Sequence, residues 1–202
     1  MQAVWDFLNN PRRTGGICGV IFTILFIIGG PVLQGDYPIV NDNAQDVRSY
    51  WIDHGHQYLV GDFLFGIAVV LFFVPFVAAL RSVLSTGDRS GGMWPRTFVL
   101  GAIVAVILGG AGAAPSAGLA ISGARGLDDS TLLFATRAGA YSSAGLGLGF
   151  ALMLIAAAVV IAQSGVLWRW LALLAAAAAV ADVFGGLWVQ DGSQRGLWAG
   201  IA

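Results

Sequence analysis

Three ionisable side chains lie within otherwise apolar stretches of this sequence: Asp62, Arg137 and Asp182. A charge inside a membrane span is costly unless it is paired, so such residues mark candidate functional sites. Counted from the predicted outer ends of their helices, they lie about 6 Å, about 9 Å and about 12 Å deep. We therefore expect one cluster in the outer third of the membrane, with Arg137 between the two carboxylates. Tyr141, one turn from Arg137, would donate a hydrogen bond to it.

Three interpretations of this cluster remain open from the sequence. The charges could form a structural ion pair that fixes the register of the helices, or they could bind a ligand or an ion. Alternatively, each side chain could extend separately to the outer surface without contacting the other two. Single substitutions of the three residues would separate these cases, because a purely structural role predicts loss of folding in each.

Asp53, His54 and His56 are further candidates, at the outer rim of the predicted membrane region. Zinc sites need three or four converging ligands, and histidines two positions apart point to different sides of a helix. The lone Cys18 provides neither an internal disulfide nor a CxxC metal site. We expect no metal and no cofactor. The sequence contains no G-x-S-x-G or H-E-x-x-H motif, so we do not expect an enzyme.

The elements that must position these residues are long apolar stretches. Crossing a bilayer takes about 20 apolar residues, and five segments satisfy this: 16–33, 58–84, 97–121, 131–163 and 167–190. They predict an all-α, polytopic transmembrane helix bundle that forms a single domain, 1–202. The apolar residues at the end of the chain would begin a sixth span. Residues 43–54 predict a short outer surface helix, because Val47, Tyr50, Trp51 and His54 follow the spacing of one helical face.

Two sequence features concern how the spans pack. Pro75 and Pro115 lie within predicted spans, where proline can kink a helix. Four small residues recur at every fourth position of segment 131–163, a spacing that lets another helix approach closely: Gly139, Ser143, Gly147 and Ala151.

The composition and charge distribution indicate where the protein resides. The chain is 57% hydrophobic and 10% charged, against about 25% charged residues in soluble domains. Its net charge of −1 argues against a nucleic-acid partner. With the N-terminus inside, the inner segments hold twice as many arginines as the outer ones: Arg12, Arg13, Arg81, Arg89, Arg96 and Arg169 against Arg48, Arg125 and Arg195. The positive-inside rule therefore predicts a multi-pass plasma-membrane protein with a cytoplasmic N-terminus.

The acidic outer stretch, the V-x-x-Y-x-x-x-H surface helix and the second span ending in a Leu-Arg pair together resemble a known group of proteins. In this chain the matching residues are Val47, Tyr50, His54, Leu80 and Arg81, followed later by an L-x-R-W segment at 167–170. The pattern resembles small polytopic membrane proteins of unknown function that are common in high-GC actinobacteria. This resemblance implies a helical membrane bundle with a sixth span, and it implies no activity.

We therefore expect an integral membrane protein without enzymatic activity. It would be either an accessory subunit of a membrane complex or a binder of a lipid-like or small ligand near the outer leaflet. Its partners would be membrane lipids and either further copies of itself or a larger membrane complex. The alternative function is that of a small-solute or ion-coupled transporter.

Overall fold

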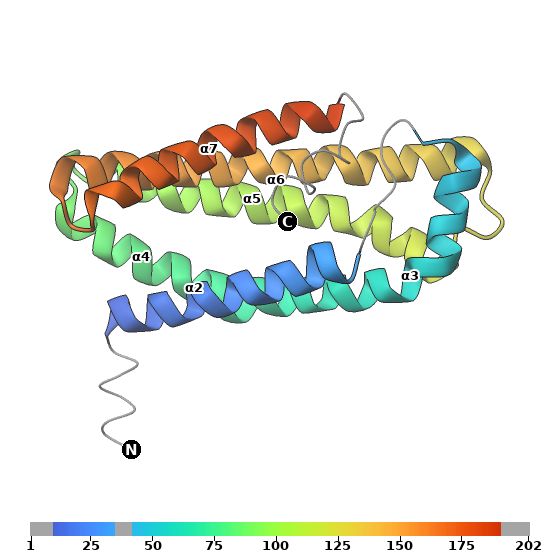
Figure 1. Cartoon of the computed structure of the whole chain (residues 1–202), viewed down its shortest axis with the longest axis horizontal. Helices are drawn as coiled ribbons and strands as arrows, with labels where there is room; N and C mark the ends of the chain where they lie inside the picture. Colours follow the sequence, from blue (N-terminus) through green and yellow to red (C-terminus); the bar gives the residue numbers. More distant parts are fainter. Residues whose placement is uncertain (1–9, 35–41, 191–202) are drawn as a thin grey trace, which may run out of the picture.

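The computed structural model of the chain describes residues 10–34 and 42–190, and every regular element in them is helical (Figure 1). This confirms the predicted all-α class. In chain order the elements are α2 (Pro11–Ile27), the π-helical turn η1 (Ile28–Val32), α3 (Ala44–Ile67), the π-helical turn η2 (Ala68–Phe73), α4 (Val74–Gly87), α5 (Met93–Ser122), α6 (Asp129–Ser164) and α7 (Arg169–Gln190).

Four helical stretches in the described part of the chain are long and apolar enough to cross a membrane: Arg12–Gly30, Ala44–Gly87, Met93–Ser122 and Asp129–Ser164. α7 occupies the fifth predicted segment but is not among these four. The predicted start of a sixth span lies outside the described residues.

The expected surface helix and second span form one continuous helical stretch, from Ala44 to Gly87. Its start is fixed by Asn43, whose side chain accepts hydrogen bonds from the backbone N–H groups of Gln45 and Asp46 at 3.0 and 2.9 Å. The first turns of α3 cross the end of the bundle, and the helix then bends to follow the bundle axis (Figure 1). A Cβ atom on the buried Gly55 would lie 2.9 Å from Ala120 O, so this glycine lets α3 rest directly on α5.

A proline lies within the first π-helical turn, and another lies two residues after the end of the second. Pro31 lies inside η1, where Leu33 N–H donates to Ile28 O at 3.1 Å, five residues back. η2 ends immediately before α4, whose second residue is Pro75, and there Val74 N–H donates to Val69 O. Proline has no N–H and its ring crowds the preceding turn. A locally widened turn accommodates that constraint without ending the helix. Pro115, by contrast, lies within an uninterrupted α5.

Two helical layers face each other along the bundle. One consists of α2 with the α3–η2–α4 stretch, and the other of α5, α6 and α7, within which α5 and α6 share the most extensive interface (Figure 1). α5 and α6 approach most closely at glycines: a Cβ on Gly149 would lie 2.4 Å from Ala105 N, and one on Gly101 would lie 2.6 Å from Met153 N.

Two separate apolar clusters join the layers, one toward each end of the bundle. The first lies toward the end of the bundle where α2, α5 and α7 begin, near several arginines, and we call it the basic-end cluster. It includes Phe73, Val77 and Leu84 from the first layer, packed on residues of α5, α6 and α7. The cap cluster joins Val47, Tyr50, Trp51 and Tyr58 of α3 to Leu119 and Ala120 of α5 and to Leu132 of α6. The region between the two clusters contains the cavity described next.

Candidate functional site

A cavity of about 220 Å³ lies between the two layers. Its lining comes from α2, the α3–η2 stretch, α5 and α6: Phe22, Asp62, Phe65, Gly66, Val69, Val70, Phe73, Ala105, Val106, Gly109, Gly110, Ala113, Leu146 and Phe150. Asp62 is the only polar side chain among them. An apolar wall with one polar group is the usual composition of a small-ligand site.

The helical period of the α3–η2 stretch produces one wall of the cavity. Asp62, Phe65, Val69 and Phe73 follow each other at intervals of three or four residues, so they share one face. From Asp62 to Phe73 this face extends about 16 Å along the helix. The carboxylate therefore lies at the end of the wall nearer the cap cluster, and aromatic rings line the remainder.

The opposite wall is formed mainly by small residues of α5. Ala105, Gly109 and Ala113 recur at every fourth position, and a Cβ on Gly110 would meet nothing within 4 Å. Val70 is 66% exposed, and Gly66 and Gly110 are also exposed. The cavity therefore reaches the side of the bundle between η2 and α5.

A close contact between two glycines fixes the position of Asp62. A Cβ on Gly61 would lie 2.3 Å from Gly29 O, and one on Gly29 would lie 2.8 Å from Gly61 O. The η1 turn thus packs directly against the α3 backbone one residue before Asp62. The Asp62 side chain is half-buried, and within residues 10–34 and 42–190 its carboxylate makes no hydrogen bond or ion pair.

Arg137 and Asp182 do not join Asp62. A Cβ on Gly147 of α6 would lie 3.3 Å from Asp182 O, which places Asp182 beside that glycine in the α6–α7 interface. Arg137 precedes Gly147 by ten residues, or about 15 Å along α6, too far for its side chain to bridge. In the part of the chain that the structure describes, no ion pair links Arg137 to either carboxylate. The structure thus does not bring the three together, and Tyr141 is exposed on α6.

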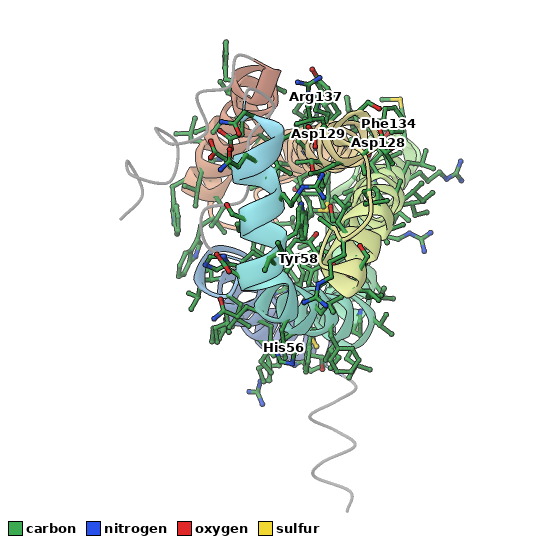
Figure 2. The ribbon with its side chains drawn as sticks, turned by 90° about the vertical axis from the view of Figure 1, so that its right-hand side faces the viewer. His56, Tyr58, Asp128, Asp129, Phe134 and Arg137 are labelled. Carbon is green, nitrogen blue, oxygen red and sulfur yellow. The ribbon has the colours of Figure 1, made fainter. Side chains whose placement is uncertain are left out.

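The outer-rim residues lie on the part of α3 that crosses the end of the bundle. Asp53, His54 and His56 are all exposed, and the His54 ring stacks on Tyr50 with centroids 5.1 Å apart. Figure 2 shows His56 on the opposite side of this end from Asp129 and Arg137. Among the described residues, no group of three or more potential ligands could hold a metal ion.

Arg48 makes a contact between helices that the sequence alone did not indicate. Its guanidinium donates to Ala124 O at 2.7 Å, to Leu127 O at 2.9 Å and to Asp129 Oδ1 at 2.9 Å. It therefore fastens the crossing part of α3 to the α5–α6 connection and to the start of α6. Two of its acceptors are backbone carbonyls more than 70 residues away in sequence, so no local pattern indicated the contact.

The α6 N-terminus beside this contact is capped by Asp128. Its carboxylate accepts hydrogen bonds from Thr131 N–H at 3.0 Å, from Thr131 Oγ1 at 2.7 Å and from the Ser130 hydroxyl. These bonds, that from Ser130 first, hold the pKa of Asp128 well below its usual range. Asp128 is thus the N-cap of α6.

Comparison with protein-family models finds no match, and no curated protein or solved structure proves significantly similar to this chain. The resemblance to small actinobacterial membrane proteins therefore stays a prediction.

Proposed function

We propose that the protein is an integral membrane protein that binds a small apolar or amphiphilic ligand in the cavity beside Asp62. The cavity itself carries the proposal: it has apolar walls, a single polar group and an opening on the side of the bundle. An apolar cavity of about 150 Å³ suffices for benzene, so 220 Å³ suits a ligand of one ring with a small substituent, or a short chain segment.

Large apolar side chains on the sides of the bundle support membrane insertion. Many of them are exposed on α2, on the η2 turn and on α5, as at Val20, Leu71 and Ile107. Isolated exposed hydrophobic residues are ordinary in soluble proteins, but a continuous apolar circumference on helices of this length requires lipid to cover it. A ligand dissolved in the membrane would then reach the lateral opening without crossing water.

The arginines support a cytoplasmic N-terminus in the plasma membrane. The end of the bundle where α2, α5 and α7 begin contains Arg12, Arg13, Arg89, Arg96 and Arg169. The end with the cap cluster contains most of the described acids: Asp42, Asp46, Asp53, Asp128 and Asp129. By the positive-inside rule the basic end faces the cytoplasm, which places Asp62 in the outer half of the membrane.

Cysteine labelling tests this orientation. In a Cys18→Ser background, single cysteines are introduced at two exposed helix starts, Gln45→Cys at the acidic end and Met93→Cys at the basic end. We expect a membrane-impermeant maleimide to label Gln45→Cys in intact cells and Met93→Cys only after permeabilisation. The reverse pattern would overturn the orientation.

A pair of glycine substitutions on α5 tests ligand binding. Gly110 lines the cavity and Gly118 does not, and an added Cβ has open space at both positions. Gly110→Leu should therefore fill the cavity, while Gly118→Leu adds the same side chain elsewhere on the helix. The probe is 4-fluoro-tert-butylbenzene, observed by ¹⁹F NMR with the protein in phosphatidylcholine nanodiscs.

We expect a protein-bound fluorine resonance with wild type and with Gly118→Leu, and none with Gly110→Leu. The same bound signal in all three proteins would mean that the probe binds elsewhere. No bound signal in any of them, with either the neutral probe or its cationic counterpart, would refute the proposed function.

A further inference from the structure

We infer that the preferred ligand of the cavity is a monocation with an apolar body, and that Asp62 is its counter-ion. This inference rests on the proposed ligand-binding function and names the chemical class that the site selects. Its basis is the combination of one carboxylate and four phenylalanine rings in a single lining.

Charge balance is the first reason. Among the lining residues that the structure describes, Asp62 is the only ionisable one. In the parts of the chain described, no cation lies within ion-pair distance of it. A carboxylate held between apolar helices is favourable only when a positive charge or a set of hydrogen-bond donors compensates it. A bound cation supplies that compensation, whereas a neutral ligand of the same shape does not.

The aromatic lining is the second reason. Phe22 and Phe73 have ring centroids 4.8 Å apart, and Phe73 meets Phe150 edge-on at 5.7 Å. The three rings thus form a continuous aromatic surface across α2, η2 and α6. This surface lies toward the end of the wall away from Asp62 and binds the apolar body of the ligand. Phe65 lines the cavity one turn from Asp62, so its ring lies near the charge, and ring faces attract organic cations most strongly where water is excluded.

The size and the opening of the cavity restrict the ligand further. A volume of about 220 Å³ accepts one charged group with a small apolar body rather than a whole phospholipid. The lateral opening beside Val70 and Gly110 favours a cation that partitions into the membrane over a strongly hydrated metal ion.

Two probes of the same shape separate charge from size. They are (4-fluorophenyl)trimethylammonium and 4-fluoro-tert-butylbenzene, which differ by nitrogen in place of one carbon and by one positive charge. Binding is measured from the ¹⁹F resonance in neutral nanodiscs, and only the part of the signal that Gly110→Leu abolishes is counted. The variant is Asp62→Asn, which keeps the size of the side chain and removes its charge.

We expect wild type to bind the cation at least about tenfold more tightly than the neutral probe. Asp62→Asn should lose this preference while retaining the neutral probe, which also shows that the variant folds. Phe65→Leu should weaken the cation preference severalfold through loss of the lining ring one turn from Asp62, whereas Phe22→Leu should weaken both probes alike.

The remaining outcomes are distinguishable. Equal or stronger binding of the neutral probe by wild type would overturn the cation inference and leave the proposed function standing. A cation preference that Asp62→Asn does not change would overturn the role of Asp62. Failure of both probes to bind would overturn the inference and the proposed function together.

Discussion

Replacing Arg48 by methionine should destabilise the protein by about 3 kcal/mol. Methionine keeps most of the apolar stem but removes the guanidinium that reaches Ala124 O, Leu127 O and Asp129. Hydrogen bonds to a charged group contribute about 1.5–3 kcal/mol each, and the Arg48 side chain is only 30% exposed. Because water can still reach it in part, we take the lower end of that range for each of the two carbonyl contacts.

The ion pair should contribute much less than the two carbonyl contacts. The Asp129 side chain is 72% exposed, and exposed pairs typically contribute about 0–1 kcal/mol. Asp129→Asn should therefore cost less than about 1 kcal/mol and should remove any salt dependence of the Arg48 contribution. Arg48→Lys should fall between the two variants, because one ammonium group cannot reproduce the planar fork that contacts both carbonyl oxygens.

Reversible unfolding in mixed dodecylphosphocholine and SDS micelles, followed by loss of helical ellipticity, gives the free energies of unfolding. Hydrogen exchange across residues 44–57 shows whether the loss is local to the crossing part of α3. An Asp129→Asn variant as unstable as Arg48→Met would refute the reasoning, because the exposed ion pair would then carry the energy assigned to the carbonyl contacts.

Three further predictions concern the helices themselves. Gly149→Ala should cost about 3 kcal/mol or prevent folding, because its Cβ meets backbone at 2.4 Å, whereas Gly118→Ala should fold normally. Gly110→Leu should stabilise the protein more than Gly118→Leu does, because it also fills a cavity; equal unfolding free energies would contradict this. The lowered pKa of Asp128 means that its stabilisation is present above about pH 4 and is lost as acidification passes the folded-state pKa. Amide exchange at Thr131 should accelerate there beyond its intrinsic rate, and Asp128→Asn should abolish that pH dependence.

The helices of this fold could be predicted because hydrophobicity and length alone determine them. α5 and α6 enclose the predicted segments 97–121 and 131–163. The continuity of α3 into the second span was less predictable. The sequence predicts a surface helix over 43–54 and a span over 58–84, with Gly55 between them. A glycine weakens a helix, but here the missing side chain allows α3 to contact Ala120 within one continuous helix. Only the tertiary contact distinguishes these two roles of glycine.

The candidate site could be predicted only in part. Asp62 stands out because a carboxylate in an apolar stretch is rare. Its supposed partners were chosen by counting depth from the outer end of each predicted span, on the assumption that these ends all lie at one membrane surface. α6 has 36 residues, about 54 Å at 1.5 Å per residue, and bilayer cores are about 30 Å thick. Arg137, early in that helix, is therefore displaced toward the capped end of the bundle and away from Asp182.

The aromatic and small-residue walls explain why an opening exists at this level. Four phenylalanine rings share the cavity lining with α5 positions that are mostly glycine or alanine: Phe22, Phe65, Phe73 and Phe150. Bulky rings opposite small residues interlock only where the two backbones can approach each other. Here the cap cluster and the basic-end cluster hold the two layers apart on either side of the cavity.

An unfilled cavity of this size would be costly. At about 24 cal/mol per Å³ for an enclosed cavity, 220 Å³ corresponds to about 5 kcal/mol, and the opening on the side of the bundle makes this an upper bound. Stability alone would favour a larger residue at Gly110, where the chain has room for one. Stability would equally favour an apolar residue in place of Asp62. Keeping both a void and a charge at one place is difficult to reconcile with a purely structural role, and a ligand that fills the void and neutralises the carboxylate accounts for both.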